Sequence, residues 1–174
     1  MKRPLLLVLA AMLLVAEPAF ADTTVGVVNI QQIMRDSKAA NSVRGQLKEK
    51  QKSFQADLDA KEKALLAEDQ SLAKQSTTTD KAAFEQKVKD FRAKAATAQR
   101  EVQTKKMQLD KAFAGSLEQI QTSVLAIVKD VAAEKKLSLV LTSSAALYND
   151  PTLDITPEVL KRLDAKLPTV QVNF

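Results

Sequence analysis

Basic side chains on one stretch of the sequence are the residues whose type and placement suggest a function. Between Asn41 and Lys111 there are 16 basic and 11 acidic residues, a net charge of +5, whereas residues 22–40 and 112–174 together have a net charge of −1. The candidate binding residues on the second half of this stretch are Lys81, Lys87, Lys94, Arg100, Lys105, Lys106 and Lys111. Such a cluster attracts an acidic partner. A solvated helix that needs charge for solubility would show the same excess, so both interpretations stay open.

The residue types that most catalytic sites need are missing. The sequence has no histidine and no cysteine, which removes the imidazole bases, thiol nucleophiles and usual zinc ligands. Its 3 glycines are too few for a glycine-rich phosphate loop. Neighbouring acids, such as Asp57 with Asp59 and Glu68 with Asp69, fall on a predicted solvated helix and are better explained by solubility. We therefore predict no enzyme, no cofactor and no metal site.

The basic residues fall on a long helix, which the spacing of apolar residues predicts from about Thr79 to Lys136. Apolar residues recur there at steps of four and three, as in a coiled-coil seam. They are Phe84, Val88, Phe91, Ala95, Ala98 and Val102, and then, from Phe113 on, Leu117, Ile120, Val124, Ile127 and Val131. Between the two sets the seam passes Lys105, Leu109 and either Ala112 or Phe113. The register is therefore expected to slip close to Gly115.

A second predicted helix, from about Lys38 to Lys74, precedes the long one. Its seam residues are Val43, Leu47, Phe54, Leu58, Leu65 and Leu72. Asp36 or Ser37 can cap its start, and Thr79 or Asp80 can cap the next helix. The connection at residues 75–80 is short, so the two helices should run antiparallel. Residues 41–111 then form a hairpin arm with its tip near 75–80, roughly 55 Å long at 1.5 Å per residue.

Short strands and a last helix are predicted on either side of the arm. Residues 24–29 and 137–141 have the β-branched or alternating apolar pattern of strands, and 145–148 is a candidate third strand. Thr156-Pro157-Glu158 is a typical helix start, with a hydroxyl cap, and Pro168 ends that helix. Residues 170–174 suit either a strand or a loose tail. The predicted fold class is α+β, mainly α, with a small β-containing body from residues 22–40 and 112–174.

The body has more apolar surface than one chain is expected to cover. The predicted oligomer seam consists of Leu117, Ile120, Val124, Ile127, Val131, Leu139 and Leu141. Three short strands would also leave exposed edges, which proteins usually close or cover. We therefore expect the body to be completed by oligomerisation.

The first 21 residues have the pattern of a secretory signal peptide. Lys2 and Arg3 precede an apolar run at residues 5–16, and Ala19-Phe20-Ala21 has small residues at the cleavage spacing. The run is short for a membrane-spanning helix, which needs about 20 apolar residues, so an uncleaved anchor is the less favoured interpretation. We predict export, with cleavage after Ala21.

Several motifs together resemble the Skp/OmpH family of periplasmic chaperones over the whole chain after residue 21. They are the opening strand Val25-Gly26-Val27-Val28-Asn29-Ile30, the hairpin, the strand Leu139-Val140-Leu141, the pair Tyr148-Asn149, and the segments Asp154-Ile155-Thr156 and Val159-Leu160-Lys161. The resemblance implies a periplasmic homotrimer, shaped like a jellyfish, whose β body is shared by three subunits. It also implies an ATP-independent holdase, which binds unfolded outer-membrane proteins, its clients, in a cavity between the arms.

A holdase that binds clients through the arm's basic residues has one further partner to consider and two alternative functions. Some family members are proposed to bind lipopolysaccharide, so this lipid or the membrane surface is a possible further partner, although no residue pattern for it is matched here. A structural or adaptor coiled coil of the cell envelope would share the arm's composition. A nucleic-acid binder is disfavoured by the export signal. It is also disfavoured because Phe54, Phe84 and Phe91 fall on seams, where bases cannot stack on them.

Overall fold

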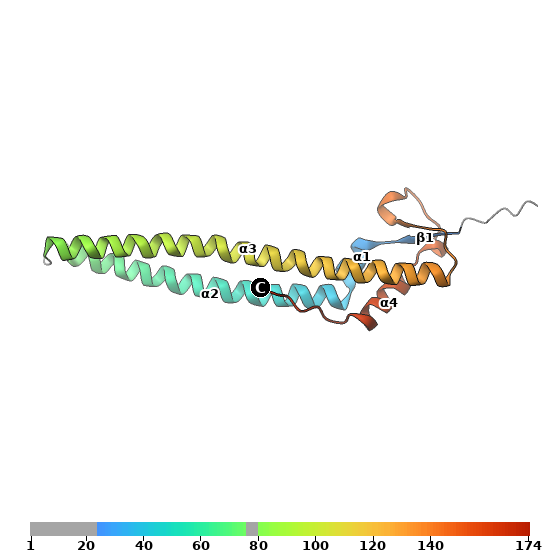
Figure 1. The fold of residues 1–174 in the computed structure, drawn as a ribbon, viewed down its shortest axis with the longest axis horizontal. Coiled ribbons are helices and arrows are strands. Elements are labelled where there is room, and N and C mark those ends of the chain that lie inside the picture. Colours follow the sequence, from blue (N-terminus) through green and yellow to red (C-terminus); the bar gives the residue numbers. More distant parts are fainter. Residues whose placement is uncertain (1–23, 76–79) are drawn as a thin grey trace, which may run out of the picture.

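The computed structural model describes residues 24–75 and 80–174, so the predicted signal peptide and residues 76–79 lie outside the described residues. The elements are β1 (Val25–Val28), α1 (Ile30–Asp36), α2 (Lys38–Gln75), α3 (Lys81–Glu134), β2 (Leu139–Thr142), the short 3-10 helices η1 (Ser143–Ala145) and η2 (Pro151–Leu153), and α4 (Thr156–Lys166). Figure 1 shows α2 and α3 as a long hairpin with the strands, α1 and α4 gathered at one end. The prediction of a mainly helical chain with a small sheet is confirmed.

The two arm helices begin at caps that the sequence predicts. The Ser37 hydroxyl accepts a hydrogen bond from the Ala40 N–H at 3.2 Å, and an Asp80 carboxylate oxygen accepts from the N–H groups of Ala82 and Ala83 at 3.2 and 3.3 Å. These bonds satisfy N–H groups that have no partner inside a helix. Ser37 and Asp80 are therefore confirmed as caps, while Thr79 lies outside the described residues.

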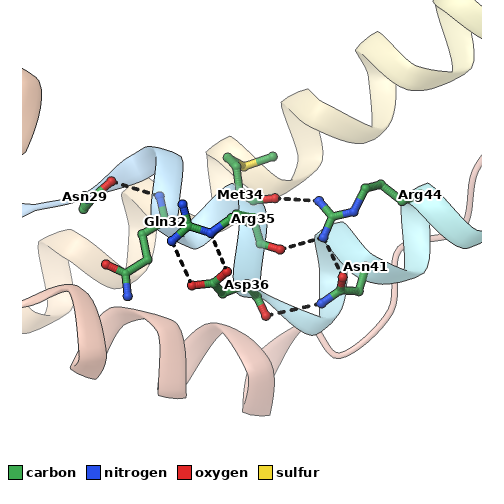
Figure 2. Close-up of polar contacts among 7 residues, drawn as sticks. All are labelled: Asn29, Gln32, Met34, Arg35, Asp36, Asn41 and Arg44. Atoms are coloured by element: carbon green, nitrogen blue, oxygen red, sulfur yellow. Dashed lines mark hydrogen bonds and ion pairs between the residues drawn. The ribbon is translucent and has the colours of Figure 1, made fainter.

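The junction between α1 and α2 is fixed by polar side chains, as Figure 2 shows. The Arg44 guanidinium donates to the carbonyl oxygens of Met34, at 2.9 Å, and Arg35, at 2.6 Å, which belong to the last turn of α1. It also donates to the Asn41 side-chain oxygen, and the Asn41 amide donates to the Asp36 carbonyl. A basic side chain is well suited to the free carbonyls at a helix end. Arg44 thus fixes the angle at which the arm leaves α1.

The sheet consists of β1 and β2, which pair in parallel with Val25 opposite Leu139 and Val28 opposite Thr142. On its other side β1 forms a bridge between Val27 and Asp154. Within the described residues, the outer edge of β2 has no strand beside it. The third strand expected at residues 145–148 was wrong, because the chain there leaves η1 without pairing to a strand. A short apolar segment has β-like composition, but it forms a strand only where a partner edge is within reach.

The two motifs that the resemblance places at opposite ends of the chain meet beside β1. The Thr156 hydroxyl is fully buried and accepts a hydrogen bond from the Asn29 N–H at 2.8 Å. The Asn29 side-chain oxygen caps α1 by accepting from Gln32 N–H at 2.9 Å. Thr156 was predicted as the cap of α4, but it lies inside the helix, and the Asp154 carboxylate accepts from its N–H instead. The Thr156 hydroxyl therefore joins α4 to the start of α1, directly after β1.

The body core is built from α1, the start of α2, the second half of α3 and α4. Ile33, Val159 and Leu163 are fully buried in it. Two polar ties hold α4 in place: Asp164 accepts from the Lys38 N–H at 2.7 Å, and Arg162 forms ion pairs with Glu134 of α3 and Glu158. The hydrogen bond from Arg162 lowers the pKa of the Glu134 carboxyl below its ordinary value.

This core corrects the predicted oligomer seam. Four of its residues, Ile120, Val124, Ile127 and Val131, are 4 % exposed or less within a single chain. The expectation that one subunit cannot cover them was wrong, because α1 and α4, distant in sequence, pack on this face. Leu117 of α3 and Leu141 of β2 are half-buried, and Leu139 of β2 is exposed.

Near Gly115 the buried seam of α3 runs through other residues than those expected from the sequence. Ala112 and Ser116 are buried, whereas Phe113 is 48 % exposed and Val102 is 43 % exposed. The buried positions 112, 116, 120 and 124 are four residues apart, whereas the steps of a heptad seam average about 3.5 residues. The buried stripe on α3 therefore passes through Ala112 and Ser116 and leaves Phe113 beside it. Small residues fill the seam there, and two large ones are left on its flank.

Candidate functional site

All seven basic residues predicted to bind clients lie on the arm part of α3, but their charges are not equally available. Lys94 forms an ion pair with Glu68 of α2 at 2.8 Å, and Lys105 forms one with Asp57 at 2.9 Å. Lys87 donates a hydrogen bond to the Gln75 side-chain oxygen at 2.5 Å. These three residues therefore join the two helices.

The cross-links between the helices share one antiparallel register. A further ion pair joins Lys61 of α2 to Glu101 of α3. The ion pairs join Asp57 to Lys105, Lys61 to Glu101 and Glu68 to Lys94. Each step forward along α2 is matched by a step of the same number of residues backward along α3. Exposed pairs contribute little stability each, typically below about 1 kcal/mol. Their constant register nevertheless favours one alignment of the hairpin over a slipped one.

Lys105 occupies a seam position, and the structure explains how the seam accommodates its charge. Its side chain is only 18 % exposed, and its ammonium nitrogen lies 4.5 Å from the centre of the Phe54 ring. Lys50 lies over the same ring at 4.9 Å. The hydrogen bond from Lys105 lowers the pKa of the Asp57 carboxyl. Lys105 therefore stabilises the helix pair and has little charge to offer a partner.

The other four predicted residues are more available. Within residues 24–75 and 80–174, no hydrogen bond or ion pair is found for the side chains of Lys81, Arg100, Lys106 and Lys111. All four are exposed on α3. They extend from the first turn of the helix to the base of the arm, so a partner near the arm meets positive charge along its length.

A groove between α2 and α3 at the base of the arm adds apolar surface to this charge. We name it the basal groove, and its lining includes Leu47, Leu58, Val102, Lys106, Leu109 and Phe113. The exposed faces of Val102 and Phe113 border it, and Lys106 brings an unpaired charge to it. Sequence reasoning missed this groove because it assigned both residues to the buried seam. The signal was the uncertain choice between Ala112 and Phe113.

A second groove lies further along the arm, where the seam is alanine-rich. Ala64, Leu65, Ala93 and Ala98 line it together with the ion pairs of Glu68 and Glu101. Small side chains leave space between the helices there. The arm thus has shallow apolar grooves on a charged surface, an arrangement suited to holding extended chains loosely.

The body also has uncovered apolar surface beside the sheet. Leu139, Leu147 and Tyr148 are exposed, as is Leu125 on α3. Leu125 also lines a hollow whose other walls come from β1, α1, α3 and β2, among them Val28, Ile30, Met34, Val128 and Leu141. Isolated apolar side chains on a surface are common, but a hollow of this kind beside an open strand edge is typical of an interface.

Two further searches concern the described residues. No group of three or more acidic side chains in residues 24–75 and 80–174 is placed to hold a metal ion. None of the helices in this part of the chain is long and apolar enough to cross a membrane.

The fold defines a class of architecture in which a long helical hairpin stands on a small α+β body. Exposed basic residues lie along the hairpin. The family model "Outer membrane protein (OmpH-like)" matches residues 24–163. The chain therefore belongs to the OmpH-like family.

Two proteins similar to this chain come from other bacteria. A protein of Aquifex aeolicus (strain VF5), described as uncharacterized, is 28% identical over 142 residues, which cover 79% of this chain and 83% of that protein. A crystal structure from Caulobacter crescentus CB15, described as a candidate outer membrane chaperone (OmpH-like), superimposes with a TM-score of 0.80 at 25% identity. It covers 84% of this chain and 87% of that chain.

Proposed function

We propose that this protein is an ATP-independent periplasmic holdase that binds unfolded outer-membrane proteins between its arms and prevents their aggregation. The observation that carries the proposal is the arm, which combines the apolar basal groove with four basic side chains that have no ion-pair partner among the described residues. Membership of the OmpH-like family and the likeness to a candidate outer membrane chaperone support a chaperone-type role.

The proposed client class follows from the chemistry of the arm. Strands of outer-membrane barrels alternate apolar and polar residues, so their unfolded chains expose many small apolar sites. Shallow grooves hold such sites weakly, and many weak contacts together delay aggregation without fixing one conformation. The net charge of +5 on residues 41–111 adds attraction for an acidic client. The Debye length of about 8 Å at physiological salt limits the range of that attraction.

We further propose a homotrimer in which the β2 edges and the exposed apolar residues of three bodies meet. Leu125, Leu139 and Leu147 would be covered there, and the arms would surround one space. Sedimentation equilibrium is expected to give three times the subunit mass at micromolar concentration. A folded monomer under those conditions would rule this assembly out.

The holdase proposal is tested by diluting a urea-unfolded outer-membrane barrel into buffer without nucleotide and following aggregation by light scattering. The protein should suppress scattering. A variant with Val102→Ser and Phe113→Ser should suppress it less, because the basal groove loses its apolar border. Leu66→Ser is the matched control, since Leu66 is an exposed apolar residue of α2 that does not line this groove. Scattering that rises as fast as in buffer alone would overturn the proposal.

The role of charge is tested separately through the rate of capture. Replacing Lys81, Arg100, Lys106 and Lys111 by glutamine should slow association with an acidic client and flatten its dependence on salt. The control is a double variant, Glu68→Gln with Lys94→Gln, which removes an ion pair without changing the net charge. If the fourfold variant captures clients as fast as the wild type at low salt, these residues serve solubility instead.

A further inference from the structure

The last residues of the sequence, which lie beyond the family match at residues 24–163, dock on the arm. After α4 the chain forms neither of the two structures considered from the sequence, a strand or a loose tail. Figure 1 shows it running back along α2. Val170 is 1% exposed and Val172 is 8% exposed, whereas Gln171 and Asn173 are exposed. The segment is therefore extended, with its apolar side chains alternately buried.

One side chain of α2 holds the main chain of this segment. The Gln46 amide donates to the Val170 carbonyl oxygen at 2.7 Å, and its side-chain oxygen accepts from the Val172 N–H at 3.1 Å. A residue on a neighbouring parallel strand would bond the same pair of groups. The Ser42 hydroxyl accepts from the Gln46 amide at 3.0 Å and helps to orient it. These bonds depend on the main chain, so any extended segment of suitable side chains can make them.

The surroundings favour apolar residues at every second position. Val170 and Val172 enter the body core, and the Phe174 ring lies 5.2 Å from the Lys50 ammonium nitrogen. A groove beside the end of the segment is lined by Phe174 itself together with Ser42, Gly45, Gln46, Glu49, Lys50 and Ser53. Its floor is open, since a Cβ added at Gly45 would meet nothing within 4 Å. Phe174 is 43 % exposed, so the end of the segment is held more loosely than its middle.

We propose that the face of α2 around Gln46 is a binding site for an extended peptide with alternating apolar residues, and that residues 170–174 occupy this site as a built-in ligand. Strands of outer-membrane barrels have this period of two. A client strand would therefore compete with the chain's own segment. The existence of the site is argued from the contacts that α2 makes with residues 170–174. Only the identification of its natural ligand as a client strand rests on the proposed function.

Competition with a tethered segment has a predictable size. A segment joined by a short linker acts at an effective concentration in the millimolar range. The affinity of a free peptide is then reduced in proportion to the fraction of protein in which the segment has left the site on α2. Removing the segment should therefore raise the affinity for a free peptide roughly tenfold or more.

The first experiment uses the full chain and a synthetic ten-residue peptide that alternates valine with polar residues. Saturating peptide should speed hydrogen exchange of the Val172 amide, because displacement breaks its bond to Gln46. A peptide of the same composition with its valines clustered should not. If both peptides leave the Val172 amide protected, the proposal is wrong.

The second experiment measures fluorescence anisotropy of a labelled peptide with the sequence of residues 167–174. A chain that ends at residue 169 should bind this peptide. The full chain should bind it with an affinity that is lower by a factor of roughly ten or more. Gln46→Leu should weaken binding to the shortened chain, whereas Gln55→Leu, an exposed glutamine of α2 that bonds Asp59, should not. A folded shortened chain that fails to bind the peptide would overturn the proposal. Peptide binding without aggregation suppression would keep the site and refute only its client.

Discussion

Thr156→Val tests whether the contact between the two ends of the chain stabilises the body. Valine keeps the branched shape of threonine but cannot accept the hydrogen bond from the Asn29 N–H, which is 2.8 Å long in the structure. The N–H group would then be left without a partner in a largely buried place. Such a loss costs about 1–3 kcal/mol. This is a large share of the about 5–15 kcal/mol by which domains are typically stable.

Urea unfolding at one fixed protein concentration is the assay, since subunit association would otherwise shift the transition. With a slope of about 2 kcal/mol per molar urea, the midpoint should fall by roughly 0.5–1.5 M. Hydrogen exchange of the Asn29 amide gives a local measure, and Thr156→Ser is the control because it keeps the hydroxyl oxygen. A Thr156→Val midpoint equal to that of the wild type, with a protected Asn29 amide, would refute the reasoning.

Three other perturbations have definite expected results. Lys136, at the end of α3, has φ of 54°, a conformation that favours glycine, so Lys136→Gly should raise stability by about 1 kcal/mol in urea unfolding. Gly115→Ala should also stabilise by about 0.5–1 kcal/mol, because a Cβ there meets nothing within 4 Å inside a helix; a lower midpoint would contradict this. Because Lys105 lowers the pKa of Asp57, their pairing stabilises the arm above the ordinary pKa of 3.8 and is lost as the pH falls below it. Helicity measured by circular dichroism should therefore fall in acid, and Asp57→Asn should remove this part of the fall.

The arm was predictable because its information is local. Steps of four and three in apolar residues predict a helix and its seam, and Ser37 and Asp80 supply caps within a few residues of the bonds they make. Even the slip near Gly115 follows from where the heptad spacing fails. The side to which the seam moved was not predictable, because it depends on the burial of two small residues, Ala112 and Ser116, in place of Phe113.

The body was less predictable because its contacts join distant parts of the chain. The sequence does not indicate that Val159 and Leu163 share one core with Ile127, or that the Thr156 hydroxyl bonds to Asn29 and not to its own helix. Residue pattern alone therefore assigned buried core residues to an oligomer seam.

The candidate binding residues were identified by charge, and charge alone does not show which lysines have partners. Lys94 and Lys105 face acids that lie far away in sequence and are close only once the hairpin has formed. The apolar part of the site at Phe113 was hidden for the same reason as the seam shift. Sequence therefore located the arm, and the structure separates its available charges from its cross-links.

The measurement that tests the central claim most directly is site-specific photocrosslinking to an unfolded outer-membrane barrel. The photoreactive residue p-benzoylphenylalanine is placed at position 106 or 113 in the basal groove, or at position 161 on the exposed surface of α4. If clients are held between the arms, they should crosslink from positions 106 and 113 and not from position 161. Crosslinks from position 161 alone, with none from the basal groove, would contradict the account.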